Sequence, residues 1–433
     1  MATVKIDVTK TLGKMKPVHG VGQPPYYGLT FPYFHYLKEA GIPYSRLHDM
    51  GSYHGGRLVD IHCVFPNFDA DPENPDSYDF AFTDPLIAAL VKNGVEPFWR
   101  LGETIENYCY IKAYNIHPPK DNLKWAKICE GIIRHYTEGW ANGFKYKIDH
   151  WEIWNEPDNA PTNPENQMWT GTMEEYFELY RVSSKYLKER FPHLKIGGYA
   201  SCGFYAITGG DGSGGNCTPR HEYFVEFFDK FLDYVKENDC PLDFFSWHTY
   251  EKDPEKIRIC AQYARNRLDE MGFTETTTSC NEWNCCHDKR GTPKHAAMTA
   301  AVLSIFQDEP VDTACFYDAR LGPSAYGGMF NPMTHEPLCA YYTFGFFNEL
   351  YKLGTQVKAE CTNDKDVYCV SACDGKTVAT MIVNTSATVK PMKIELDGRM
   401  TECKLIAEKL TPEEITSPAE LPPESVLLVI AEL

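Results

Sequence analysis

The sequence predicts a (β/α)8 TIM barrel with a small antiparallel β-sandwich at its carboxyl end. From residue 17 to residue 355, short apolar runs alternate with helical patterns, as in repeated βα units. After residue 355, short segments of period two replace them, which is typical of a sandwich. We therefore expect a barrel at residues 17–355 and a sandwich at residues 356–433. Val4, Ile6 and Val8 alternate in the same way, so residues 1–16 are expected to add a strand to the sandwich.

Eight apolar segments are candidate barrel strands. They cover residues 18–22, 44–48, 95–102, 148–155, 195–200, 242–250, 276–282 and 312–317. Eight parallel strands with intervening helices close most economically as a barrel, whose active site lies at the carboxyl ends of the strands. Polar side chains at those ends are therefore the first candidates for chemistry.

Two helices between these strands have clear start signals. Asp121 is an N-cap candidate before a segment whose apolar residues, from Trp125 to Tyr136, fall on one face. Thr172 and Glu175 match a capping box before a second amphipathic segment. In the sandwich, the expected strands cover residues 367–370, 377–383, 392–396, 404–408 and 426–433.

The composition narrows the choice of partner. The chain has 433 residues and a formal charge of −18, which argues against nucleic acid and anionic membranes because a negative field repels them. A neutral ligand fits this charge better. The sequence contains no run of about 18 apolar residues, and it does not begin with a basic segment followed by an apolar one, so we expect neither a membrane span nor a secretion signal.

The cysteines indicate a reducing compartment. The chain has 16 of them, scattered without the short, regular spacing of a disulfide scaffold. We therefore expect reduced thiols and a cytoplasmic, bacterial-type protein, although removal of a signal before Met1 would leave the same sequence. A homo-oligomer is compatible with the sequence, which carries no signal for or against it.

Two Asn-Glu dipeptides end apolar, aromatic runs, and they carry most of the functional information. Asn155-Glu156 ends the fourth predicted strand and Asn281-Glu282 ends the seventh, so both glutamates are expected on the same face of the barrel. Glycoside hydrolysis requires two such carboxyl groups, one to protonate the leaving oxygen and one to act at the anomeric carbon. We expect Glu156 to be the acid/base and Glu282 the nucleophile, with Glu156 protonated and Glu282 ionised.

These stretches resemble glycoside hydrolase family 39, in the clan of retaining (β/α)8 glycosidases. The resemblance covers about residues 17–355 and rests on several spaced motifs: residues 46–48, 78–80, 94–98, 151–157, 197–198, 243–250 and 281–283. The family includes β-xylosidases, α-L-iduronidases and other exo-glycosidases. It therefore implies the retaining chemistry more firmly than the sugar, and its β-sandwich companion fits the carboxyl end.

Further side chains are candidates for binding the sugar. Arg46 and His48 share a face at the end of the second strand, and His248 and Tyr250 share one at the end of the sixth. Each pair has a structural alternative, an ion pair inside the barrel for the first and a packed histidine and tyrosine for the second. The full set of candidate substrate-binding residues is Asn155, Arg46, His48, His248, Tyr250, Trp283, Asp318 and Arg100. Glu152, four residues before Glu156, is expected to form a structural ion pair.

Arg100 departs from the family pattern, where an acidic or neutral residue tends to follow the Pro-Phe of the third strand. Its guanidinium would bind a uronate carboxylate, or it would pair with Glu103 or Glu152 and leave the substrate alone. We favour the ion pair. Asp318, at the end of the eighth strand, is a candidate partner for non-anomeric hydroxyls, and Arg320 keeps the uronate alternative open.

Two other segments invite a functional interpretation. The insertion at residues 51–77 is expected to wall the site with Tyr53, His54, Asp60, His62, Phe65 and Phe68. Cys280, Cys285, Cys286 and His287 have no established zinc spacing, so we expect no metal. No glycine-rich phosphate loop or dinucleotide motif is present, so we expect no cofactor.

The sequence therefore predicts a retaining exo-glycoside hydrolase that acts on an oligosaccharide or small glycoside. A β-xylosidase-like or related neutral-sugar activity is the first choice and a uronidase-like or iduronidase-like activity the alternative. An inactive carbohydrate-binding barrel is the alternative from a different class, which the intact pair of Glu156 and Glu282 disfavours.

Overall fold

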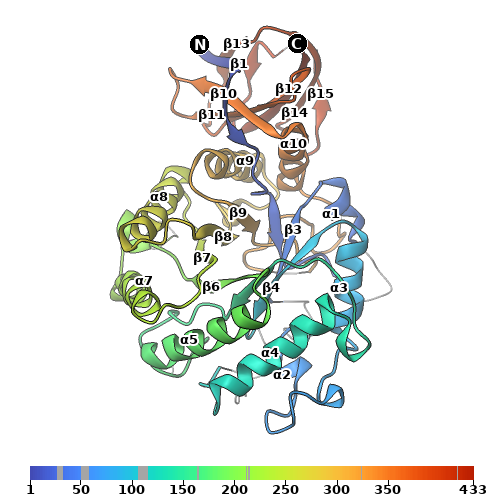
Figure 1. The fold of residues 1–433 in the computed structure, drawn as a ribbon. Helices are drawn as coiled ribbons and strands as arrows, with labels where there is room; N and C mark the ends of the chain where they lie inside the picture. The colour runs from blue at the N-terminus through green and yellow to red at the C-terminus, as the bar shows by residue number, and fades with distance from the viewer. Residues whose placement is uncertain are drawn as a thin grey trace.

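The computed structural model describes residues 1–26, 33–49, 58–105, 116–162, 165–210, 212, 215–322, 324–416 and 418–433. Tyr53, His54 and part of the glycine-rich segment at residues 209–215 lie outside this description. Figure 1 shows a barrel ringed by helices, with a β-sheet region at one end that contains both termini. The predicted fold class is confirmed.

The barrel closes through eight parallel strands in chain order. Each of the eight predicted segments matches one of them, and two strands, β6 and β8, extend one residue beyond the prediction. The strands are β2 (Gly20–Gly22), β3 (Tyr44–Leu47), β4 (Glu96–Leu101), β5 (His150–Ile153), β6 (Lys195–Ser201), β7 (Phe244–Thr249), β8 (Thr277–Trp283) and β9 (Thr313–Phe316). Almost every residue of these strands is buried, because side chains pack both inside the barrel and against the outer helices.

The helices connect the strands on the outside of the barrel (Figure 1). They are α1 (His35–Glu39), α2 (Ile61–Val64), α3 (Thr83–Lys92), α4 (Asn122–Thr137), α5 (Met173–Arg190), α6 (Tyr205–Thr208), α7 (Pro219–Glu237), α8 (Pro254–Met271), α9 (Pro293–Asp308) and α10 (Cys339–Leu353). Short 3-10 turns occur at Pro75–Ser77, Trp140–Asn142 and His287–Lys289. Both predicted caps are confirmed: Asp121 accepts the Lys124 amide at 3.0 Å, and Thr172 and Glu175 form a reciprocal capping box. No helix in the described part of the chain is long and apolar enough to cross a membrane.

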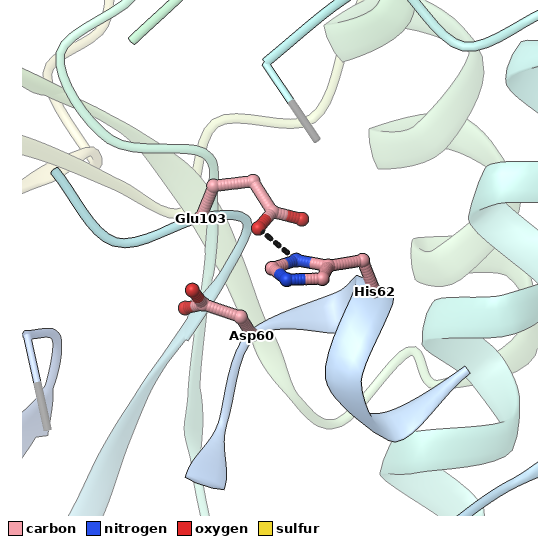
Figure 2. A group of neighbouring side chains, drawn as sticks. All are labelled: Asp60, His62 and Glu103. Carbon is pink, nitrogen blue, oxygen red and sulfur yellow. Dashed lines mark hydrogen bonds and ion pairs between the residues drawn. The ribbon is translucent and has the colours of Figure 1, made fainter. Parts of the chain in front are cut away.

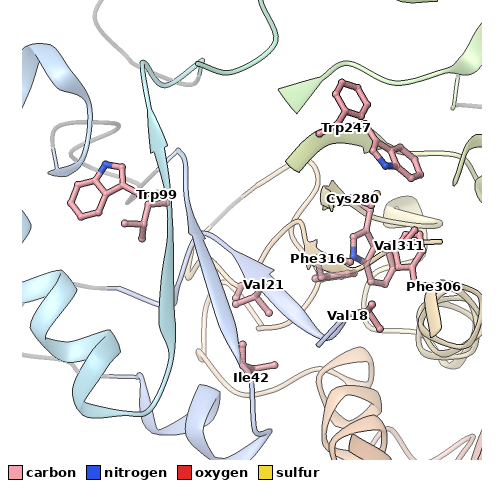
Figure 3. Packing of buried hydrophobic residues seen from close by; sticks show 14 of the residues in the cluster. Val18, Val21, Ile42, Trp99, Trp247, Cys280, Phe306, Val311 and Phe316 are labelled. Atoms are coloured by element: carbon pink, nitrogen blue, oxygen red, sulfur yellow. The ribbon is translucent and has the colours of Figure 1, made fainter. Parts of the chain in front are cut away.

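Large aromatic side chains fill the layer between strands and helices, and they fix which residues face the barrel interior. Trp99 of β4 packs on Tyr136 of α4, with ring centroids 4.9 Å apart, and Trp247 and Phe316 occupy the same layer farther round (Figure 3). Because successive strand residues face opposite sides, the neighbours of these rings point into the barrel. The outward tryptophans at 151, 247 and 283 thereby place Glu152, His248 and Glu282 inside.

The second unit is a nine-stranded sheet with the order β15-β14-β17-β12-β11-β10-β1-β13-β16. Its strands are β1 (Ala2–Lys14), β10 (Thr355–Cys361), β11 (Val367–Cys373), β12 (Thr377–Asn384), β13 (Lys390–Glu395), β14 (Arg399–Ile406), β15 (Glu413–Glu414), β16 (Glu420–Leu421) and β17 (Ser425–Glu432). β1 pairs antiparallel with β10 and parallel with β13, so one pair in this otherwise antiparallel sheet is parallel. An apolar cluster that includes Val4, Ile382 and Leu427 lies inside it. The division of the chain near residue 355 stays a prediction.

Candidate active site

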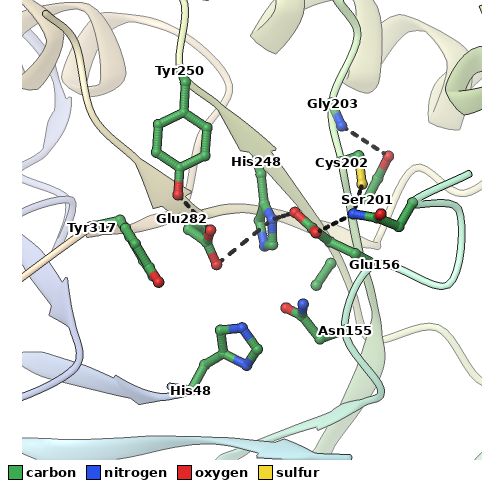
Figure 4. A network of polar contacts seen from close by, with 12 residues as sticks. His48, Asn155, Glu156, Ser201, Cys202, Gly203, His248, Tyr250, Glu282 and Tyr317 are labelled. Atoms are coloured by element: carbon green, nitrogen blue, oxygen red, sulfur yellow. Dashed lines mark hydrogen bonds and ion pairs between the residues drawn. The ribbon is translucent and has the colours of Figure 1, made fainter. Parts of the chain in front are cut away.

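Glu156 and Glu282 meet at the carboxyl end of the barrel. Glu282 lies within β8, and Glu156 follows β5 by three residues. At least one oxygen of each carboxyl group lies within 4.8 Å of an oxygen of the other, with His248 between them (Figure 4). This close approach is compatible with a retaining glycosidase, in which the two carboxyl groups stand about 5 to 5.5 Å apart.

The two carboxyl groups line a cavity of about 440 Å³. Its other described lining residues come from loops and helix starts around the barrel mouth: Ile105, Asn159, Gln167, Cys202, Tyr205, Gly212, Arg220, His221, Phe224, Tyr250, His287, Tyr317 and Tyr326. The mixture of aromatic and polar side chains in a concave site is typical of small-molecule binding.

Glu282 is held by a permanent cation and a phenol. Arg46 donates from Nη1 to Glu282 Oε2 at 3.0 Å, and the Tyr250 hydroxyl donates to Glu282 Oε1 at 2.5 Å. Arg46 also donates to Glu152 at 2.9 Å, which is the buried ion pair expected for Glu152. The remaining guanidinium nitrogen of Arg46 donates to Asn155 Oδ1 at 2.6 Å. Arg46 therefore holds three side chains together: Glu282 of β8, Glu152 of β5 and Asn155 just after β5.

The contact to Arg46 fixes the orientation of Asn155. Because its Oδ1 accepts from Arg46, its Nδ2 is left as a donor, and this buried nitrogen has no hydrogen-bond partner within the described structure. His248 Nε2 is likewise buried and without a partner among the described residues. Unsatisfied buried polar atoms are rare in proteins. Beside two carboxyl groups in a cavity, they are suited to sugar hydroxyls.

Glu156 is positioned by a histidine and an asparagine. His248 Nδ1 lies 2.8 Å from Glu156 Oε1, and Asn159 Nδ2 donates to Glu156 Oε2 at 3.0 Å. The backbone of Glu156 has a φ of +46°, and its amide donates to the Ala200 carbonyl at 3.0 Å. Left-handed backbone at a non-glycine residue is uncommon and concentrates at functional sites.

The loop after Glu156 is tied to the end of β6. Asp158, two residues after Glu156, accepts from the Ser201 hydroxyl at 2.9 Å and from the Cys202 amide at 3.1 Å. Burial raises the pKa of Asp158 to about 7, and the charge of Glu156 adds to the rise. The loop that carries the acid/base candidate therefore has little freedom to move away from the neighbouring strand.

The surroundings shift the pKa values of Glu156 and Glu282 in opposite directions. Burial raises the pKa of Glu282 above its ordinary value, with a further rise from Glu156 and opposition from His248, Arg46 and Tyr250. Burial alone would also raise the pKa of Glu156, but contacts led by His248 hold it below the ordinary value.

His248 shifts in the opposite sense to a simply buried histidine. Burial lowers its pKa, but the two glutamates outweigh burial and raise the pKa above its ordinary value. The 2.8 Å contact between His248 and Glu156 allows a proton to pass between the two side chains. The expectation that Glu156 holds the proton stays a prediction.

Arg100 forms an ion pair, but with a partner different from those predicted. It donates from Nη2 to Asp60 Oδ1 at 2.6 Å and from Nε to His48 Nδ1 at 3.1 Å, and does not pair with Glu103 or Glu152 among the described contacts. Burial and the neighbouring arginines lower the pKa of His48, so its ring is neutral. Glu103 instead pairs with His62 (Figure 2).

Within the described residues, two groups bring potential metal ligands together: Asp60, His62 and Glu103, and Glu156, His248 and Glu282. In the first group both Asp60 oxygens are engaged, by Arg100 and by the amide and hydroxyl of Thr104. In the second, Arg46 and Tyr250 occupy the Glu282 oxygens. Hydrogen bonding and charge pairing account for both groups.

Several predicted binding residues lie away from the cavity surface. Trp283 is fully buried and packs edge-on against Phe306 of α9 and Phe316 of β9, because it faces outward where Glu282 faces inward. Asp318 is also buried, with Arg320 Nη2 3.3 Å from its Oδ2. From the insertion at residues 51–77, Phe65 packs on Tyr78 and Phe68 lies under Lys124, so neither lines the cavity.

Other cavity residues were not predicted from the sequence. Asn159 contacts Glu156 from a loop, Arg220 comes from the first turn of α7, and His287 and Tyr326 come from the loops after β8 and β9. Tyr317 follows β9 and donates its hydroxyl to Asp49 at 2.7 Å. Of these residues, only Tyr317 carried a signal in the sequence, because it lies at the end of a predicted strand.

Comparisons with known proteins agree with this geometry. The model of the family "Glycosyl hydrolases family 39" matches residues 11–314. A β-xylosidase of Geobacillus stearothermophilus is 26% identical over 367 residues, covering 72% of this chain and 63% of the relative. A β-xylosidase of Caldicellulosiruptor saccharolyticus is 28% identical over 227 residues, covering 50% of this chain and 38% of the relative. The chain thus spans less than two thirds of the length of these curated relatives.

Solved structures show the same fold. A glucosidase from Croceicoccus marinus superposes with a TM-score of 0.78 at 20% identity, over 100% of this chain and 99% of the other. A monomeric β-xylosidase from Caulobacter crescentus CB15 superposes with a TM-score of 0.68 at 17% identity, with the same coverage. With the family model matching most of the barrel and both glutamates inside the matched region, this chain belongs to glycosyl hydrolase family 39.

Proposed function

We propose that this protein is a retaining, exo-acting glycoside hydrolase of the β-xylosidase type, which cleaves a neutral terminal sugar from a small glycoside or oligosaccharide. The observation that carries the proposal is the spacing of the Glu156 and Glu282 carboxyl groups, whose nearest oxygens lie within 4.8 Å. The β-xylosidase names of the two curated relatives support the choice of sugar.

In the first step, Glu156 protonates the glycosidic oxygen while a Glu282 oxygen bonds to the anomeric carbon, and the bond from that carbon to the leaving group breaks. The proton reaches Glu156 from His248 along their 2.8 Å contact. In the second step, Glu156 removes a proton from water, the water oxygen bonds to the anomeric carbon, and the ester bond to Glu282 breaks. The configuration of the sugar is thereby retained.

Binding of the 2-hydroxyl falls to Asn155. Its Nδ2 has no protein partner among the described residues, and its amide is fixed by Arg46, which also holds Glu282. A hydrogen bond to the 2-hydroxyl strengthens as the oxocarbenium-like state develops. Arg46 thus orients the nucleophile and the hydroxyl donor together.

A neutral sugar is favoured over a uronate because the charge of Arg100 is already balanced. Asp60 lies 2.6 Å from its guanidinium, and both side chains are fully buried. A second carboxylate at this position would bring two anions to one cation, at a considerable desolvation cost.

The test is covalent labelling with an activated 2-deoxy-2-fluoro-β-xyloside, followed by mass spectrometry of peptides. We expect a single stoichiometric label on Glu282, because fluorine slows the second step more than the activated first step. A label on another carboxylate would refute the assignment of the nucleophile.

A screen of chromogenic xylosides, glucosides, galactosides, arabinosides and uronides should accompany the labelling. If a uronide is turned over at least about tenfold better than the others, the uronidase alternative is correct. If none of them is turned over, the protein is the inactive carbohydrate-binding alternative.

A further inference from the structure

Arg220 lines the catalytic cavity, and its guanidinium has no ion-pair partner among the described residues. Its Nε donates to the Asn159 carbonyl at 2.5 Å, and its guanidinium lies over the Phe224 ring at 4.9 Å. The described part of the chain offers it no carboxylate within ion-pair distance and no hydrogen-bond partner for its two terminal nitrogens. The side chain is exposed and lines the cavity that Glu156 and Glu282 share.

The position of Arg220 assigns it to the leaving-group side of the cavity. Asn159 connects it to the acid/base candidate, because Asn159 accepts from Arg220 through its carbonyl and donates to Glu156 through its side chain. The general acid must lie beside the glycosidic oxygen. Residues that lie beside Glu156 on the side away from Glu282 therefore face the leaving group.

The opposite wall of the cavity has a different chemistry. Tyr250, which donates to Glu282, packs against Tyr326 at 4.7 Å and Tyr317 at 6.0 Å, and His287 lies 5.1 Å from Tyr326. Burial lowers the pKa of His287, so this wall is neutral and aromatic. Among the described lining residues, the arginine lies on the side of the acid.

We propose that Arg220 binds a carboxylate on the leaving group, so that the preferred substrates are neutral sugars linked to an acidic residue. This inference rests on the proposed function and names its substrate class more closely. Arginine binds carboxylates through two parallel hydrogen bonds from a planar fork, and both terminal nitrogens of Arg220 are available for that.

The net negative charge of the chain opposes an acidic substrate, so binding one requires a local cation. A chain with a formal charge of −18 and two glutamates in its cavity would repel an acidic substrate unless a cation lay where the acidic group binds. The leaving-group carboxylate is distinct from the sugar that Glu282 attacks, so a neutral sugar at that position and an acidic leaving group are compatible.

Arg220 has one competing role. Its charge is among the interactions that hold the pKa of Glu156 down, so it would tune the acid for every substrate alike. The two roles differ in one measurable respect. Tuning changes kcat/KM for all leaving groups and shifts the pH profile, whereas carboxylate binding changes the preference between an acidic leaving group and its neutral counterpart.

The experiment compares two matched pairs of substrates that carry the sugar found by the chromogenic screen. The first pair is the 4-carboxyphenyl glycoside and its methyl ester, and the second is a disaccharide ending in glucuronic acid and the same disaccharide ending in glucose. The measured quantity is the acid-to-neutral ratio of kcat/KM, because the paired leaving groups differ in intrinsic reactivity. The enzymes are wild type, Arg220→Gln, Arg220→Lys and Lys230→Gln, the last removing a charge from the exposed, Glu226-paired position on the same helix.

We expect Arg220→Gln to lower the acid-to-neutral ratio by roughly tenfold in at least one pair. Arg220→Lys should retain part of the preference, and Lys230→Gln should retain all of it. A loss in the disaccharide pair identifies a uronic acid, and a loss confined to the aryl pair identifies an aromatic acid. An unchanged acid-to-neutral ratio in both pairs overturns the proposal. This holds even if kcat/KM falls equally for both members of a pair. If wild type cleaves no neutral aryl glycoside, the proposed function itself fails, which is a separate result.

Discussion

His248 Nδ1 lies 2.8 Å from Glu156 Oε1 and 3.8 Å from Glu282 Oε2, so one imidazole contacts both carboxyl groups of the site. This places a single proton in reach of three titratable groups. The active form requires an ionised Glu282 and one proton shared between His248 and Glu156. Loss of that proton removes the acid, and gain of a second proton on Glu282 removes the nucleophile.

The pH profile of kcat/KM should therefore be bell-shaped. The raised pKa of Glu282 places the acid limb above pH 4.5, and the raised pKa of His248 places the basic limb above pH 6.5. His248→Gln should move the acid limb to higher pH, because the charge that lowers the pKa of Glu282 is gone. An acid limb that moves to lower pH would contradict this arrangement. His193→Gln, at an exposed position near the opposite ends of the strands, is the matched control.

Glu282→Gln should abolish turnover of every glycoside, by at least about 10⁴-fold in kcat. The amide retains the shape of the side chain but does not form the glycosyl ester. Because Arg46 still contacts Asn155 and Glu152, the fold should persist, which circular dichroism and the melting temperature would check. Full activity in protein shown by mass spectrometry to be free of wild type would rule out Glu282 as the nucleophile.

Glu156→Ala should separate substrates by their leaving groups. Dinitrophenyl glycosides need no proton to leave, so their first step should be nearly unchanged, while alkyl glycosides should slow by about 10²- to 10⁴-fold. Azide, which needs no general base, should restore turnover and yield a glycosyl azide of retained configuration. Equal losses on both kinds of leaving group would argue against the acid/base role.

The barrel was predictable because the sequence carries two signals for most of its strands. Each is a short apolar run, and most end in a polar residue, as Asn155-Glu156 does after β5. In β5, Trp151 packs outside the barrel against Trp99, and the next residue, Glu152, points inside to Arg46. The same alternation explains why Trp283 packs on α9 and not on a sugar.

The rest of the site depends on contacts that no local pattern encodes. Asp60, the partner of Arg100, lies 40 residues earlier in the chain. The sequence had instead suggested Glu103 or Glu152 as the partner. Asn159 and Arg220 reach the cavity from a loop and from the first turn of a helix, where sequence offers only composition. Their roles depend on the fold, which brings the loop of Asn159 and the first turn of α7 close to Glu156.

Arg100→Met should destabilise the protein without changing its choice of sugar. The substitution leaves the Asp60 carboxylate buried and uncompensated, which costs about 3–5 kcal/mol. The double variant Arg100→Met, Asp60→Asn should recover much of that loss, as urea unfolding would show. The ratio of kcat/KM for a uronide to that for the xyloside should stay unchanged in the more stable variant. A selective loss on the uronide would instead assign Arg100 to substrate binding.

The last prediction concerns a histidine that supports the site from behind. His295 Nε2 lies 3.0 Å from Asn284 Oδ1, and Asn284 Nδ2 donates to the carbonyls of Tyr317 and Tyr326, both at 2.8 Å. Since the amide nitrogen of Asn284 is used as a donor, His295 must donate from Nε2. Its Nδ1 is buried without a partner in the described structure, so the ring is neutral. The loops after β8 and β9 are thereby joined through a neutral imidazole.

Burial lowers the pKa of His295 to about 3, whereas in the unfolded chain it has its ordinary value near 6.5. Between these two values the unfolded chain binds one more proton at this residue than the folded protein does. The contribution to stability is therefore complete above pH 6.5, and it declines by up to about 1.4 kcal/mol for each unit of pH below that. His295→Gln should lower the free energy of unfolding at pH 7.5, because the amide fills the site less well. From pH 6 to pH 4, however, its stability should fall less steeply than that of wild type, as urea unfolding at each pH would measure. Parallel slopes for the two proteins would mean that His295 titrates alike in the folded and unfolded states, contrary to its burial.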